Sequence, residues 1–433
     1  MTTNVEIMKT KAEKAFAEHF ASVSGSLPSD AVALDARQAA MSRFDELGLP
    51  HRRIESWKYT DLRNALTVDV PAVGDATAVS AADLDAALGP LAGLDTYRAV
   101  FVNGRLDEGL STLPSMTGVE IGSSSGAPAM DDALAAESIV ALNTAFVTGG
   151  LAIKIADGVA VDKPLMIVSA RAGGSDLLVT TRHDVSVGTK ASLTLIEAFA
   201  SIGGTAGQSN ALVTITIADG GRLDHTKVGA TVAISDLATW RAHLGNEATY
   251  RAFQLIPGAP LARNQVFVTF DGEGSALDFA TAAMGNGKDH IDSTIVVDHR
   301  AVGCTSRELF KGVLDDSARG VCQGKVIVQQ IAQKTDGKQM AQALMLSEDC
   351  EFDSKPELEI YADDVVCGHG STSAEVDPDL VFNCRSRGIP EAEAKVLLTE
   401  SFVAETIDHV SSESLRDALS EIARNWLAAN HTK

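Results

Sequence analysis

A stretch of more than 200 residues, from about residue 151 to residue 366, consists of short aliphatic and β-branched runs separated by glycine and aspartate. Typical runs lie at 165–168, 212–217 and 294–297. Such runs favour β-strands, and the small residues between them favour turns. Because helical periodicity nearly disappears here, a doubly wound α/β fold, which needs crossover helices, is not expected.

One turn sequence recurs within this stretch. The tetrapeptide Ile-Ala-Asp-Gly closes a run at 155–158 and again at 217–220, and Asp271-Gly272 closes another run in the same way. A recurring turn indicates stacked coils, so the pattern suits a β-helix or, alternatively, a large β-sandwich. Aromatic residues make up only 5% of the chain, so its core must rely on Val, Ile, Leu and Ala, which suits narrow stacked sheets.

Helical patterns flank the β-rich stretch. Phe16 and Phe20 share one face of a first helix, and Met41 and Phe44 share one face of a second helix. Helical periodicity returns after Pro390, which stands where a helix can begin.

These patterns divide the chain into three regions. We predict an N-terminal helical region with a short hairpin near Asn103-Gly104 at 1–145, a β-helix core at 146–383, and a C-terminal helical region at 384–433. The fold class is therefore mainly β, with α-helical regions at both ends.

The last helix is strongly amphipathic. Leu415, Leu419, Ile422 and Trp426 recur at three- and four-residue steps. Packing against the chain's own core is one explanation of this face, and docking of a partner is the other.

Charge excludes several classes of partner. The formal net charge is -22, which repels a phosphate backbone and disfavours anionic membranes, so neither nucleic acid nor a membrane is expected as a partner. No window approaches the roughly 18 apolar residues of a membrane span, and the first residues are charged in place of an apolar signal core. We expect a cytoplasmic protein.

All five cysteines lie after residue 300, and none forms a Cys-x-x-Cys pair. The odd count argues for reduced thiols, and the spacing gives little support for a structural zinc site. We expect Cys304, Cys322 and Cys350 to be buried small apolar residues, and His290 and His299 to be surface or hydrogen-bonded histidines.

Common catalytic motifs are missing from the sequence. It contains no P-loop, no complete dinucleotide-binding glycine motif and no Gly-x-Ser-x-Gly elbow. Paired carboxylates at Asp315-Asp316 and Asp363-Asp364 leave one alternative function, a β-helix enzyme acting alone on a carbohydrate. Adjacent carboxylates on a strand point to opposite faces, and aromatic platforms for sugars are scarce.

Cys367 and His369 are the candidate metal ligands. On an extended strand, residues two apart project from the same face, so a thiolate and an imidazole can meet one metal ion there. The spacing alone leaves both a metal or sulfur site and ordinary packing open. A second mixed segment, at 52–62, is either a packed connector or a ligand site.

Around this pair the chain resembles the SufB/SufD family of iron-sulfur cluster assembly scaffolds, and more closely its SufD branch. The resemblance covers most of the chain and is strongest after Ser306. The matching segments are 55–60, 141–146, 306–307, 312–320, 324–328, 333–339, 355–360, the Cys367-x-His369-Gly370 signature and 386–389.

The resemblance implies a right-handed parallel β-helix flanked by helical regions. It also implies a non-catalytic subunit that pairs with a SufB-like paralogue through the β-helix and binds a SufC-like ATPase through its C-terminal helices. Leu415, Leu419, Ile422 and Trp426 then become part of the SufC dock. ATP would be hydrolysed by that partner, so no nucleotide site is expected here, and a homodimer is expected when the chain is alone.

By the same resemblance, His369 and Cys367 match residues at the SufB interface, where an iron-sulfur cluster or iron is held transiently. One strand supplies too few ligands, so the others should come from SufB. Cys322, Gly368 and Cys384 depart from the family pattern, and we interpret Cys322 and Cys384 as packing substitutions.

Overall fold

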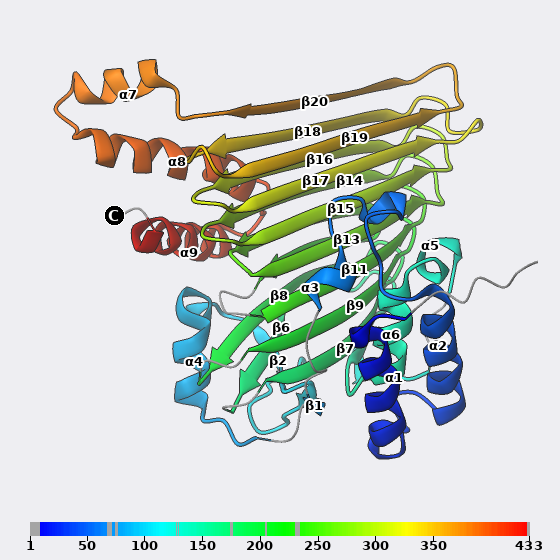
Figure 1. Cartoon of the computed structure of the whole chain (residues 1–433). Coiled ribbons are helices and arrows are strands. Elements are labelled where there is room, and N and C mark those ends of the chain that lie inside the picture. Colours follow the sequence, from blue (N-terminus) through cyan, green and yellow to red (C-terminus); the bar gives the residue numbers. More distant parts are fainter. Residues whose placement is uncertain are drawn as a thin grey trace, which may run out of the picture.

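The computed structural model describes residues 9–66, 72–73, 77–126, 128, 130–173, 176–203, 206–229 and 234–430. Within them, two ten-stranded sheets face each other and helices flank them (Figure 1). Sheet A contains β4 (Val119–Ser123), β5 (Leu151–Ile155), β7 (Leu177–Val187), β9 (Gly207–Ile217), β11 (Ile234–Leu244), β13 (Leu261–Phe270), β15 (His290–His299), β17 (Arg319–Val328) and β19 (Glu351–Ile360), with β1 (Ala72–Val73) paired to β7. Sheet B contains β2 (Tyr97–Val102), β3 (Arg105–Leu106), β6 (Leu165–Ala172), β8 (Ser192–Ile202), β10 (Arg222–Val228), β12 (Thr249–Pro257), β14 (Ala276–Gly285), β16 (Thr305–Leu314), β18 (Asp336–Met345) and β20 (Val366–Ala374).

From β5 onward the chain alternates between the sheets, and each strand pairs in parallel with the strand two positions later. Two successive strands therefore make one coil, and the coils stack into a parallel β-solenoid of about seven turns. This confirms the β-helix prediction. A β-sandwich is set aside because antiparallel pairing occurs only where β4 joins β5 and β2 joins β3 among the described strands.

The repeated tetrapeptide forms the turns that the sequence suggested. β5 and β9 end at the isoleucine of each copy, and the chain then crosses to sheet B. The glycine that closes each copy, Gly158 or Gly220, has a φ of 71° or 67°, in the left-handed region that a side chain disfavours.

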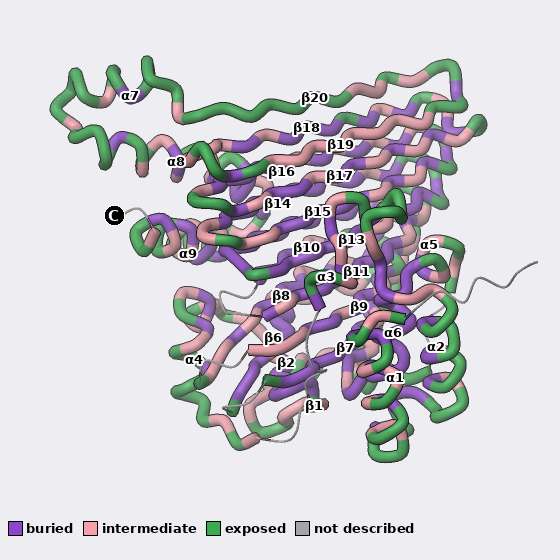
Figure 2. Tube along the Cα trace, viewed as in Figure 1, coloured by how far each residue is buried: buried purple, intermediate pink, exposed green. Residues whose placement is uncertain are grey.

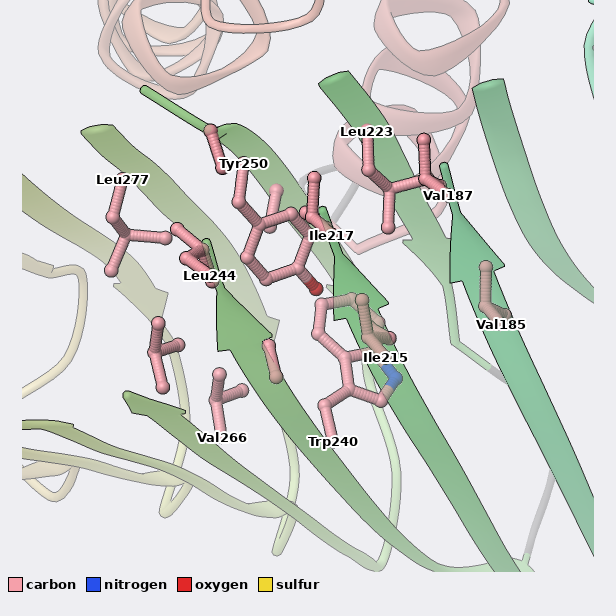
Figure 3. Packing of buried hydrophobic residues seen from close by; sticks show 14 of the residues in the cluster. Val185, Val187, Ile215, Ile217, Leu223, Trp240, Leu244, Tyr250, Val266 and Leu277 are labelled. Atoms are coloured by element: carbon pink, nitrogen blue, oxygen red, sulfur yellow. The ribbon is translucent and has the colours of Figure 1, made fainter. Parts of the chain in front are cut away.

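The solenoid interior holds the main apolar core (Figure 3). Val187, Ile217 and Leu244 point inward from sheet A, and Leu223 and Tyr250 from sheet B. Each fully buried side chain of this kind contributes about 1.5–3 kcal/mol relative to an exposed one.

Helices flank the two sheets. They are α1 (Lys11–Val23), α2 (Leu34–Leu47), α3 (Leu62–Ala65), α4 (Ala81–Leu88), α5 (Asp132–Ala135), α6 (Ser138–Phe146), α7 (Pro378–Arg385), α8 (Glu391–Ile407) and α9 (Glu413–Asn430). Helices α1, α2 and α6 form a buried apolar cluster with strands of sheet A. Helices α4, α8 and α9 form a second buried apolar cluster with strands of sheet B. None of the helices in the described part of the chain is long and apolar enough to span a membrane.

The N-terminal predictions are confirmed element by element. Phe16 and Phe20 are buried from α1, and Met41 and Phe44 from α2. β2 and β3 form the expected hairpin around Asn103-Gly104. The division at 145/146 falls at the end of α6 and that at 383/384 falls within α7; the three-region division itself stays a prediction.

The segment at 55–60 is a packed connector lying on sheet A. Trp57 is 1% exposed, and the guanidinium carbon of Arg263 lies 3.8 Å from its ring centroid. The Trp57 indole donates a hydrogen bond to Glu137 at 3.1 Å. Thr60 donates to Asp292, which also forms a fully buried ion pair with Arg263. The connector interpretation is therefore confirmed.

Candidate functional site

β20 is the last strand of sheet B, and β19 is the last strand of sheet A. Each pairs on one side only, with β18 and β17 respectively. The far side of both strands is therefore an unpaired edge. This end of the solenoid, which we call the open end, is formed by β19 and β20 and lies at the top of Figure 1. Figure 2 shows that β20 is largely exposed.

Cys367 and His369 both lie on β20, as the sequence predicted. Cys367 packs against the interior core, and its Sγ lies 3.6 Å from where a Cβ on Gly337 would stand. His369 is two residues further along, so it projects from the same inner face. It is exposed because no further coil covers it.

Burial is the main influence on the Cys367 thiol and raises its pKa, and the carboxyl groups of Asp336 and Glu308 raise it further. A hydrogen bond from the Gly337 backbone opposes this shift. The thiol is therefore protonated in the chain alone, and a cation bound beside it would be needed to stabilise the thiolate.

The two ligands do not complete a metal site by themselves. No group of three or more His, Cys, Asp or Glu side chains is arranged to hold a metal ion within the described ranges. A thiolate and an imidazole suit iron or zinc, but four-coordinate binding needs further donors. Residues 367 and 369 are thus one half of a candidate site at an open edge.

A surface groove of about 810 Å³ adjoins this pair. Arg251, Arg307 and Lys338 contribute to its wall, together with Cys367 and His369. Arg307 forms an ion pair with Asp336 at 2.6 Å, and Arg251 lies 3.6 Å from Asp224. These cations are matched by carboxylates, so the groove is not a strongly charged surface.

The proposed partner-docking face of α9 is packed against this chain's own sheet B. Leu415 is 1% exposed and Leu419 is fully buried, so neither is accessible to a partner in this conformation, and docking at these two residues stays a prediction. Ile422 and Trp426 lie at the partly buried margin of the same cluster, where docking stays a prediction. Sequence periodicity could not distinguish a face turned to the core from one turned to a partner.

Sequence reasoning missed an apolar surface on α7 and α8. Leu380, Phe382 and Leu397 are 47%, 68% and 43% exposed. α7 extends away from the solenoid beside α8 and is largely exposed in Figure 2. Three large apolar residues among charged neighbours are the signal that could have indicated this surface.

The other histidine and cysteine candidates lie outside the strand that carries the Cys367 and His369 pair. His290 and His299 are hydrogen-bonded to Thr60 at 2.8 Å and to Ser306 at 3.1 Å, as expected. Cys304 and Cys350 are buried, whereas Cys322 is partly accessible and lines an interior cavity. All five cysteines are free thiols.

The paired aspartates lie in the turns after β16 and β19. These turns are at opposite edges of the solenoid, because the first leads from sheet B to sheet A and the second from A to B. The two pairs therefore do not meet in one site, and no feature of the fold favours the carbohydrate-active alternative.

Two family models match consecutive parts of the chain. One, described as the SufBD core domain of the SUF system for FeS cluster assembly, matches residues 170–402. The other, the SufBD protein N-terminal region, matches residues 10–167.

Individual relatives agree with these matches. The iron-sulfur cluster assembly protein SufD of Escherichia coli is 31% identical over 88% of this chain and 89% of its own length. A SufBD family protein of Synechocystis is 28% identical over 90% of each chain. SufD of Bacillus subtilis is 32% identical over a shorter region, 34% of each chain.

Proposed function

This chain belongs to the SufBD family and is a SufD-like iron-sulfur cluster assembly protein, and from that premise we propose that it is the scaffold subunit of a complex with a SufB-like paralogue and a SufC-like ATPase. In this proposal it catalyses no reaction alone. Its task is to present part of a binding site for iron or a nascent cluster at the interface with the paralogue.

The observation that carries the proposal is the geometry of the open end. His369 and Cys367 project from the inner face of the last coil, where a further coil would normally stack. A second solenoid placed end to end would cover both side chains and could supply the missing ligands. Unpaired strand edges are also ready templates for pairing with another chain.

Within the site, His369 supplies a borderline imidazole ligand and Cys367 a soft thiolate. Iron and sulfide are the substrates that this scaffold holds and passes on. Because the thiol loses its proton on binding a cation, capture of iron releases a proton from Cys367. The exposed His369 can reach a partner more readily than the partly buried Cys367, so we assign it the larger role.

For the ATPase we propose a docking surface on α7 and α8, formed by Leu380, Phe382 and Leu397. Their exposure of more than 40% each supports this assignment, whereas the inner face of α9 is occupied. Ile422 and Trp426 then border the dock. ATP hydrolysis belongs to the partner, since the sequence has no P-loop.

When the partners are absent, the same open end offers two unpaired edges to a second copy of this chain. We therefore propose a homodimer for the isolated protein. The edge strand β19 carries four carboxylates and one lysine, so such a dimer should be weaker than a pair with a paralogue of complementary charge.

The test is anaerobic reconstitution after co-expression with the SufB-like and SufC-like partners. His369→Ala should lower the iron and sulfide bound per complex by about tenfold, while the three chains still co-purify. Ser373→Ala, on the same face of β20, is the matched control. An assembled His369→Ala complex with full iron and sulfide would show that this residue is not a ligand.

A further inference from the structure

An unusual group of polar side chains lies inside the solenoid, on the strands β16 to β19 that lead up to the open end. Glu308 on β16 and Gln339 on β18 are only 6% and 7% exposed. Neither oxygen of the Glu308 carboxyl group and neither polar atom of the Gln339 amide has a hydrogen-bond partner. Buried polar groups are nearly always paired, so four unpaired atoms side by side point to a missing ligand.

The pairing register brings two further donors to the same place. Glu308 and Gln339 are direct neighbours across β16 and β18. Across the interior, Cys322 on β17 is the direct neighbour of Ser354 on β19, whose hydroxyl also has no partner. Neighbouring strands lie about 4.8 Å apart, so each pair is compact.

All four side chains line one interior cavity of about 30 Å³. This space holds about two water molecules or one ion. A glycine keeps it open: a Cβ on Gly324 would stand 3.0 Å from Nε2 of Gln339. The amide therefore occupies the place that any larger residue at 324 would need.

We propose that this cavity is a second, buried site for a divalent transition-metal ion, with Cys322 and Glu308 as anionic ligands and the Gln339 and Ser354 oxygens as neutral ligands. One sulfur and three oxygen donors suit Fe(II), Co(II) or Zn(II). The assignment of iron as the physiological ion rests on the proposed function. The proposed site itself does not depend on that function.

Charge balance favours a divalent ion. A thiolate and a carboxylate carry two negative charges, so a divalent cation leaves the buried site neutral and avoids the cost of an unpaired interior charge. Only two of the four ligands are His, Cys, Asp or Glu, which agrees with the lack of any larger such group within the described residues.

The last coil forms the wall of the cavity on the side of the open end. Pro356 on β19 and Gly370 on β20 contribute to its wall. The ion would therefore lie behind Cys367 and His369, at a place where a second solenoid docked end to end would seal it.

The test uses the full-length chain with Cys367→Ser and His369→Ala, which removes the ligands of the proposed interface site. Anaerobic titration with Co²⁺ should give a near-ultraviolet thiolate-to-cobalt absorption at one ion per chain. Adding Cys322→Ser should abolish this band, and adding Glu308→Gln should weaken Co²⁺ binding at least about tenfold. Cys350→Ser, a buried thiol outside the cavity, is the control and should leave the titration unchanged.

A titration without the band, or a band that survives both Cys322→Ser and Cys322→Ala, would overturn the proposal and leave the cavity as a water site. Circular dichroism checks that each variant is folded. Because the interface ligands are absent throughout, this result is independent of whether His369 binds iron in the complex.

Discussion

At the scale of single residues, the interior polar group around Glu197 has the hydrogen-bond partners that the group around Glu308 lacks. His225 contacts Glu197 at 2.8 Å and Tyr250 at 3.1 Å. Trp240 also donates to Glu197 at 2.8 Å. Burial would raise the pKa of Glu197, but the hydrogen bond with His225 and the electrostatic effect of nearby Lys227 outweigh it and the pKa is lowered. Satisfied networks of this kind specify a unique packing, whereas the unsatisfied group at Glu308 indicates function.

The sequence predicted which residues share one face of a strand, but not which residues of different strands meet. Two-residue spacing placed Cys367 and His369 on one face of a strand, and the structure agrees. The sequence could not show that Cys322, Glu308 and Gln339 share a cavity, because they meet through register between strands far apart in the chain.

Two buried histidines should make stability depend on pH. Burial lowers the pKa of both His183 and His299 to about 4, with Glu197 and Asp184 partly opposing this at His183. In the unfolded chain each has a pKa of about 6.5. Between these values the unfolded state binds more protons, so stability is full above pH 6.5 and is lost as the pH falls toward 4.

The loss should reach about 1.4 kcal/mol per pH unit for each histidine. Urea unfolding at pH 7 and pH 5 measures it. The double variant His183→Gln, His299→Gln should show a shallower dependence on pH. A slope identical to that of the parent chain would mean that neither histidine is neutral in the fold.

At the scale of elements, the connector at 55–60 holds the N-terminal helices to the solenoid. It contacts β13 and β15 through Arg263 and Asp292, and Glu55 reaches Lys355 on the edge strand β19. The sequence indicated a packed connector from its two aromatic residues. It could not identify the strands beneath, which lie more than 200 residues later.

Trp57→Ala should destabilise the protein by about 3–5 kcal/mol, because it leaves a cavity over Arg263 and removes the hydrogen bond to Glu137. Chemical denaturation measures the change. Arg52→Ala, at an exposed position just before this connector, should alter stability by less than about 0.5 kcal/mol. Equal effects of the two substitutions would contradict a packing role for Trp57.

The apolar surface of α7 and α8 leads to a prediction about the ATPase. Leu380→Ala with Phe382→Ala should weaken binding of the SufC-like partner at least about tenfold, which corresponds to about 1.4 kcal/mol. Binding is measured by calorimetry with the purified chains. Leu34→Ala on α2, where the leucine is 45% exposed, is the control. Undiminished binding by the double variant would place the dock elsewhere on this chain.

Deleting α9 is a poor test of the same dock. Its inner face belongs to the buried cluster on sheet B, so truncation before Ser411 would expose Leu415, Leu419 and their neighbours. Lost binding after such a truncation would reflect unfolding as much as a missing contact.

At the scale of the whole molecule, the two ends of the solenoid differ. The first end finishes in antiparallel pairs, β4 on β5 and β3 on β2, so β4 and β3 are its edge strands. At the other end β20 is followed by α7 in place of a further strand, so two edges stay open. The short β-branched runs and the repeated turn sequence predicted the solenoid. They could not predict which end leaves β19 and β20 with unpaired edges, because that depends on strand pairing between distant parts of the chain.

The open end should fail to pair with the SufB-like paralogue when a charge is placed on its inner face. Ser371 lies two residues after His369 on β20, is exposed, and would be covered by a stacked solenoid. Ser371→Lys therefore puts an ammonium group into the new interface, a device that natural sheet edges use against pairing. Co-expression and size-exclusion chromatography should show at least about tenfold less heterodimer.

Ser115→Lys makes the same substitution at an exposed position near β4, at the opposite end of the solenoid. It should leave the heterodimer unchanged, because no pairing is proposed there. If Ser371→Lys also assembled fully, the paralogue would have to bind another surface, and His369 and Cys367 would then face solvent in the complex. The iron content of that complex would decide whether the two residues still act as ligands without a partner stacked over them.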